Sequence, residues 1–161
     1  MMKQLKVCLL IALFMGGMNG SAAEVCRISE PVTVDGKLDE PCWSKNAWEG
    51  GFAKFENVVK DREVTAKTEF ALLADERAVY LGVKCYEPDM EAVRAMPPAS
   101  LWSGNTVEFF FAPSGSAFDF YHFAVGYAES SGVYSDFASE GGNIHPDPYK
   151  PEWQVARGEF D

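Results

Sequence analysis

Alternation of apolar and polar side chains along the middle of the chain predicts β-strands. Residues 65–73 alternate in this way, and residues 79–86 alternate again after a polar turn at 75–78. Two alternating runs joined by a short polar turn are typical of a β-hairpin. In the second run we expect one set of side chains to point inward and the other outward. The inward set is Val79, Leu81, Val83 and Cys85, and the outward set is Tyr80, Gly82, Lys84 and Tyr86.

The second half of the chain continues this pattern with shorter strands. We expect strands at 106–111, 121–127 and 133–137, and the start of another at 152–155. Residues 88–103 and 141–151 show no such periodicity and are expected to be loops.

The N-terminal part of the domain combines a short strand with a short helix. Residues 31–34 read as a strand that ends at the turn pair Asp35-Gly36. Asp39 suits a helix cap and Pro41 suits the first helical turn, so a helix is expected to follow. The nearby Trp43 and Trp48 are expected to join the core.

Five or six short strands separated by turns favour an all-β fold, specifically an antiparallel β-sandwich of jelly-roll-like form with one short N-terminal helix. The chain stops at residues 159–161, just after a strand-like start. We therefore expect the domain to be truncated at its C-terminus, with its last strands missing.

Residues 1–23 have the features of a secretory signal peptide. Lys3 and Lys6 precede the short apolar run 7–15, and Ser21-Ala22-Ala23 supplies small residues for cleavage before Glu24. The sequence therefore predicts a signal peptide at 1–23, a β-sandwich domain at 24–161, and a secreted protein, either extracellular or periplasmic.

The charge of the chain excludes some partners. The 161 residues include 24 acidic and 14 basic side chains, for a formal charge of −10, and losing 23 residues with two lysines would leave 138 residues at −12. Nucleic-acid binding and attachment to anionic membranes both rely on basic surfaces, so neither is expected after signal cleavage. The remaining Cys26, Cys42 and Cys85 allow at most one internal disulfide, or are small buried hydrophobic residues.

Three segments, taken in order, resemble carbohydrate-binding module family 9, a β-sandwich family of the DOMON-like fold. Residues 32–43 (VTVDGKLDEPCW) are similar to its opening V-D-G-x-L-D-E-x-x-W stretch. Residues 73–83 (LADERAVYLGV) are similar to its D-x-x-x-L-Y-L-x-V hairpin, and residues 101–110 (LWSGNTVEFF) to its W-x-x-D-x-V-E-I-F segment. Order and spacing match from about residue 31 to about residue 155.

The resemblance implies a secreted, non-catalytic module that docks an attached glycan-degrading enzyme onto polysaccharide, in carbohydrate catabolism. Trp102 takes the place of a sugar-stacking tryptophan and Glu108 that of a sugar-binding carboxylate. The following strand carries Gln, Arg and Asn in ligand-binding members, whereas this chain has His122, Ala124 and Gly126. His122 is therefore the one polar candidate in that row, and its small neighbours are expected to leave space beside it.

Each candidate also has a structural interpretation that the sequence leaves open. Trp102 could anchor its loop, Glu108 could be a solvated strand carboxylate, and His122 could be an exposed structural histidine. A sandwich without ligand, acting as a spacer, is one alternative function. Another is a haem-binding redox domain on the same scaffold, since Met90, Met96, His122 and His145 supply suitable ligand types.

Catalysis and metal dependence are not expected. No Gly-x-Ser-x-Gly motif occurs, and no second carboxylate is placed opposite a first as a glycosidase requires. No cofactor is expected to be required and no metal ligands are assigned, although Asp136 and Asp147 leave room for a structural Ca²⁺ ion. The expected partner is a polysaccharide or oligosaccharide.

Overall fold

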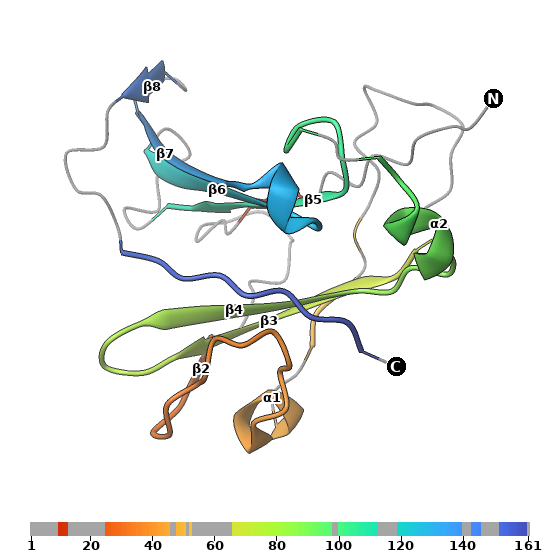
Figure 1. Cartoon of the computed structure of the whole chain (residues 1–161). Coiled ribbons are helices and arrows are strands. Elements are labelled where there is room, and N and C mark those ends of the chain that lie inside the picture. Colours follow the sequence, from red (N-terminus) through yellow and green to blue (C-terminus); the bar gives the residue numbers. More distant parts are fainter. Residues whose placement is uncertain are drawn as a thin grey trace. The chain divides into compact units, whose positions relative to one another are not determined.

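The computed structural model describes residues 10–12, 25–45, 48–50, 52, 66–97, 100–112, 119–139, 143–145 and 152–160. These residues form a mostly β protein with few helices, as the sequence predicts (Figure 1). The elements in chain order are β1 (Leu10–Ala12), β2 (Val25–Arg27), α1 (Pro41–Lys45), β3 (Thr68–Ala74), β4 (Val79–Cys85), α2 (Met90–Arg94), β5 (Thr106–Phe111), β6 (Phe120–Gly126), the 3-10 turn Glu129–Ser131, β7 (Val133–Ser139) and β8 (Asn143–His145).

The chain divides into two compact units, each built on one sheet. The five-stranded unit comprises Met1–Ala22 and Met96–Val155, with strand order β1-β5-β6-β7-β8. The three-stranded unit comprises Ala23–Ala95 and Ala156–Asp161, with strand order β2-β3-β4. Strands β1 and β2 pair in parallel with β5 and β3, and all the other pairings are antiparallel.

The β3–β4 hairpin confirms the clearest expectation from the sequence. Its register runs from Thr68 opposite Cys85 to Ala74 opposite Val79. At the turn, the Asp75 carboxylate accepts hydrogen bonds from the backbone N–H of Arg77 at 2.7 Å and of Ala78 at 2.8 Å, and from the Tyr80 hydroxyl at 2.8 Å. A short acidic side chain that satisfies backbone donors in this way is a common means of fixing a turn.

Removal of the Asp75 carboxylate should destabilise the hairpin in a pH-dependent manner. The hydrogen bonds from Arg77, Tyr80 and Ala78 lower the pKa of Asp75. The stabilisation is therefore complete above the unfolded-state value of about 3.9 and is lost as the pH falls through the lower folded-state pKa. We expect Asp75→Ala to lower the melting temperature at neutral pH, by an amount that shrinks below about pH 4.

The adjacent exposed Glu76 provides the control for this prediction, because it lies in the same turn. Thermal unfolding of Glu76→Ala should change little across the same pH range. A deficit of Asp75→Ala that stays constant down to strongly acidic pH would contradict the assigned role of the carboxylate.

The expected sidedness of β4 is incomplete, because both faces of the hairpin are buried. Phe70 and Leu72, which pair with Val83 and Leu81 on the predicted inward face, are 7% and 6% exposed.

A hydrophobic core also lies on the predicted outward face. Leu73, Ala71 and Trp43 are the buried centre of this core, at 0%, 2% and 3% exposure. Leu73 and Ala71 pair with Tyr80 and Gly82, so all four share one face. The strand alternation was detected correctly. Because β3 carries apolar residues on both faces, alternation alone does not show whether one face of the hairpin or both are buried.

The indoles of α1 and the residues after it cover this face, as the sequence predicts for Trp43 and Trp48. The two rings lie 5.9 Å apart, and a Cβ placed on Gly82 would come within 2.8 Å of the Trp43 ring. Lys84 extends its ammonium group 4.0 Å from the centre of the Trp48 ring. Glycine at position 82 therefore makes room for Trp43 on the sheet.

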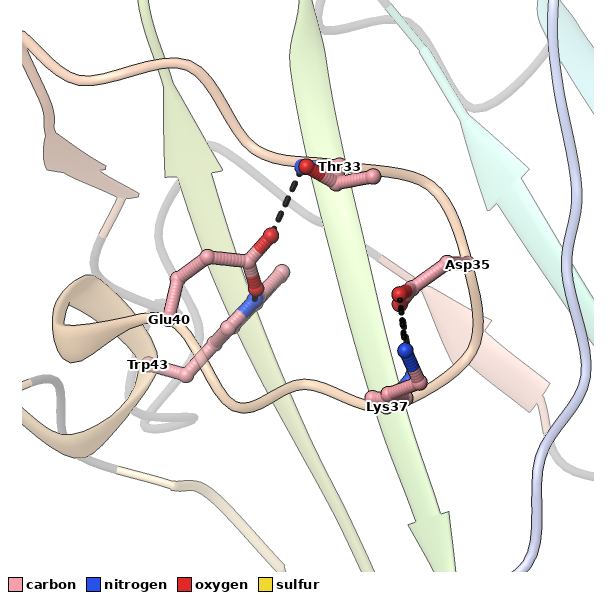
Figure 2. Close-up of polar contacts among 5 residues, drawn as sticks. All are labelled: Thr33, Asp35, Lys37, Glu40 and Trp43. Carbon is pink, nitrogen blue, oxygen red and sulfur yellow. Dashed lines mark hydrogen bonds and ion pairs between the residues drawn. The ribbon is translucent and has the colours of Figure 1, made fainter.

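Two carboxylates, Glu40 and Asp35, hold the loop before α1 (Figure 2). Glu40 accepts hydrogen bonds from the Thr33 backbone N–H at 2.7 Å and from the Trp43 indole N–H at 3.0 Å. At the expected turn, Asp35 pairs with Lys37 at 3.0 Å, and this contact lowers the pKa of Asp35. Most of the polar residues in the segment 32–43 therefore take part in contacts that hold this loop together.

Several expected boundaries are wrong. Residues 31–34 and 152–155 are irregular rather than strands. The expected loop 88–103 contains the one-turn helix α2, which Asp89 caps by accepting from the Ala92 N–H at 2.9 Å. The expected loop 141–151 contains β8, and β2 was not expected. Elements this short show too few positions for periodicity to reveal them.

β1 lies within the segment expected to be a signal peptide. Cys26, Cys42 and Cys85 are free thiols. Among the described helices, none has the length and apolar character needed to cross a membrane.

Candidate functional site

Four ionisable side chains share one face of the five-stranded sheet. In the β5–β6 register, Glu108 lies opposite Ala124 and Phe110 lies opposite His122. In the β6–β7 register, His122 lies opposite Asp136 and Ala124 lies opposite Tyr134. Directly paired residues project from the same side of a sheet, so Glu108, His122, Tyr134 and Asp136 form one group across three neighbouring strands.

A hydrogen-bonded pair lies at the centre of this group. The His122 Nε2 atom is 3.0 Å from the Glu108 carboxylate. Their side chains are mostly buried, with exposures of 19% and 17%, so water competes little for this contact. The His122 ring also stacks on Phe110, with centroids 4.3 Å apart and planes 12° from parallel. The Glu108 carboxylate and the Phe110 ring therefore both hold His122 in place.

Trp102 reaches the same group from the turn before β5. The preceding residue, Leu101, is buried, and its carbonyl accepts a hydrogen bond from the Thr106 hydroxyl. The Trp102 side chain follows this anchor and is 51% exposed. Its ring centroid lies 5.8 Å from that of His122 and 5.2 Å from that of Tyr134. Trp102 thus covers part of the group and presents the rest of its indole to solvent.

Tyr134 links the aromatic rings to a second carboxylate. Its ring lies 5.3 Å from His122, and its hydroxyl donates a hydrogen bond to Asp136 at 3.0 Å. Partial burial and this hydrogen bond raise the pKa of Tyr134, so the hydroxyl remains a donor at neutral pH. Asp136 also accepts from the Phe137 backbone N–H at 2.8 Å, which holds its orientation.

We call the set Trp102, Glu108, His122, Tyr134 and Asp136 the aromatic–acidic cluster. The structure brings together all three residues that the sequence singled out, namely Trp102, Glu108 and His122. Tyr134 was missed, and Asp136 was considered only for calcium. The alternation of residues 133–137 puts both on one face, but their neighbours become known only from the β6–β7 register.

The expectation of open space beside His122 is wrong. Ala124 is fully buried, and a Cβ on Gly126 would lie 2.5 Å from the Ser131 Cβ and 3.3 Å from Leu101. The small residues therefore accommodate protein neighbours rather than a ligand. Where the resembled family carries polar side chains, Ala124 and Gly126 of this chain pack against protein neighbours.

The described residues that the sequence suggested for metal or haem do not form a metal site. Within the described part of the chain, no three His, Cys, Asp or Glu side chains come together as a metal site. Met90 belongs to α2, whereas the Met96 sulfur is 3.9 Å from the Asn105 amide nitrogen. Asp147 and the side chain of His145 lie outside the described residues.

The described structure therefore defines a mostly β protein with an aromatic–acidic surface cluster. Comparison of the chain with protein-family models, with curated proteins and with solved structures gives no match.

Proposed function

We propose that this protein is a secreted, non-catalytic carbohydrate-binding module and that the aromatic–acidic cluster is its binding site. The half-exposed indole of Trp102, supported by His122 and Tyr134, carries this proposal. We also propose that the domain is a β-sandwich of the resembled family, attached to a larger glycan-degrading or surface protein.

The chemistry of the cluster suits a sugar. The C–H groups on one face of a pyranose ring pack against an aromatic face, and carboxylates accept hydrogen bonds from adjacent hydroxyl groups. Here the ring is already positioned, because Trp102 contacts His122 and Tyr134. Little side-chain freedom is then lost on binding, which favours affinity.

Trp102→Ala should weaken glycan binding by about 1–3 kcal/mol, the range for loss of a stacking aromatic side chain. Isothermal calorimetry with xylan, cellulose fragments and soluble oligosaccharides measures the loss. Phe160→Ala is the matched control, since Phe160 is an equally exposed ring at 50% but belongs to the other unit. This variant should bind like the unmodified chain.

Three outcomes would count against the proposal. Absence of binding to every glycan by the folded chain would favour a spacer role. An equal loss in the Trp102 and Phe160 variants would remove the cluster as the site. A Soret band in the purified protein, or after addition of haem, would favour the haem-binding alternative.

A further inference from the structure

Residues 96–155 of the five-stranded unit have a strongly one-sided charge. Between residues 96 and 155 the only lysine or arginine is Lys150, so the described part of this stretch contains neither. The same stretch contains seven acidic residues: Glu108, Asp119, Glu129, Asp136, Glu140, Asp147 and Glu152. Residues 96–155, which carry the aromatic–acidic cluster, thus hold seven acidic side chains against one basic side chain.

Within the cluster, each carboxylate is hydrogen-bonded to an aromatic side chain that contacts Trp102. Glu108 is hydrogen-bonded to His122, whose ring is 5.8 Å from the indole. Asp136 is hydrogen-bonded to Tyr134, whose ring is 5.2 Å from the indole. Two carboxylates are therefore hydrogen-bonded to the side chains that contact the indole, and the described residues of this unit include no lysine or arginine.

This arrangement favours a positive group over Trp102. The face of an indole ring attracts cations, and tryptophan does so more strongly than the other aromatic residues. Surface charges act over a distance of roughly 8–10 Å at moderate ionic strength, so nearby carboxylates reinforce that attraction. A neutral sugar would gain the stacking contact and hydrogen bonds but no charge attraction, whereas a uronic acid would be repelled.

We infer that the aromatic–acidic cluster selects glycans that carry positive charge, namely polymers of amino sugars. The inference rests on the proposed carbohydrate-binding function and adds the class of sugar to it. The indole stacks on the ring of the sugar and interacts with its ammonium group. Glu108 and Asp136 supply the electrostatic preference, and Tyr134 and His122 hold them beside Trp102.

The test compares three β-1,4-linked oligosaccharides of equal length with the full chain at neutral pH. One is built from glucosamine with trimethylated amines, which keep their charge at every pH. The second is N-acetylated and neutral, and the third is built from a uronic acid. Calorimetry should show the trimethylated oligomer binding roughly 5- to 30-fold more tightly than the neutral one, with the uronic acid weakest.

Charge-matched variants distinguish selection by the cluster from general attraction to an acidic protein. The double variant Glu108→Gln/Asp136→Asn should bring the ratio of the affinities for the charged and the neutral oligomer to about one, and this ratio, rather than either affinity alone, is the readout. The control Asp119→Asn/Glu152→Gln removes the same charge from positions outside the cluster and should keep the preference. Thermal unfolding of both variants confirms that each remains folded.

The outcomes separate the two proposals. Equal affinity for the charged and neutral oligomers would overturn the inference and leave carbohydrate binding intact. Equal loss of preference in both double variants would also overturn it, because the attraction would then be nonspecific. If none of the oligomers binds and no other glycan does, carbohydrate binding itself fails. Should the Glu108 variant unfold, Asp136→Asn alone should still reduce the preference, and an unchanged preference would contradict the inference.

Discussion

Trp43→Ala is expected to lower the free energy of unfolding by about 3–5 kcal/mol, the usual cost of truncating a large buried aromatic residue. The Trp43 side chain is 3% exposed and fills the space above Gly82. Its indole N–H donates to Glu40, which also fixes the loop through Thr33. Truncation therefore opens a cavity and leaves Glu40 without one of its donors, and urea denaturation followed by circular dichroism measures the loss.

Val79→Ala is the control for this prediction, because Val79 is an apolar residue of the neighbouring strand that is 55% exposed. Its replacement should change the free energy of unfolding by less than about 0.5 kcal/mol, as for most surface substitutions. A Trp43→Ala variant as stable as the Val79→Ala variant would contradict the assignment of the core to the Tyr80, Gly82 and Lys84 face of the hairpin.

Gly36→Ala should cost roughly 2–4 kcal/mol, from a left-handed backbone and a steric clash together. Gly36 has φ +85°, and an added Cβ would lie 2.5 Å from the carbonyl carbon and oxygen of Arg157. Those atoms are backbone and cannot rotate away. The substitution should therefore displace the segment around Gly158, whose neighbour Glu159 pairs with Arg94.

Gly132→Ala isolates the backbone-strain part of this effect. Gly132 also has a positive φ, +79°, but an added Cβ would meet nothing within 4 Å. Its replacement should cost only the strain of the left-handed backbone, about 1–2 kcal/mol. Thermal unfolding of the two variants should place Gly36→Ala clearly below Gly132→Ala. Equal melting temperatures would contradict the close contact between Gly36 and Arg157.

The sequence predicted the elements whose signals are long or strongly patterned. The β3–β4 hairpin, the Asp35-Gly36 turn, the short helix at Pro41 and the strands β5, β6 and β7 all occur within a few residues of their expected positions. Three-residue strands and a one-turn helix were not detected, because they complete too few periods. The sequence assigned one inner face to the hairpin, whereas packing of Trp43 buries the second face as well.

The candidate site was predictable in part for the same reason. Glu108 and His122 could be placed on strand faces, and the three-segment resemblance added Trp102. Their contact depends on the register of β5 and β6, which brings residues 14 positions apart within 3.0 Å. Tyr134 and Asp136 enter through a second register, and no local pattern encodes it.

The most direct test of carbohydrate binding at the aromatic–acidic cluster uses the indole N–H signals of the chain's four tryptophans in a nitrogen–proton correlation spectrum. Trp43 and Trp48 donate these groups to Glu40 and to the Trp43 carbonyl within the core of the other unit, so they serve as internal controls. Trp102→Phe identifies the remaining signal of interest by its loss. Titration with oligosaccharide should shift the Trp102 signal progressively and leave those of Trp43 and Trp48 in place. A stationary Trp102 signal while other signals move would contradict the assignment of the site.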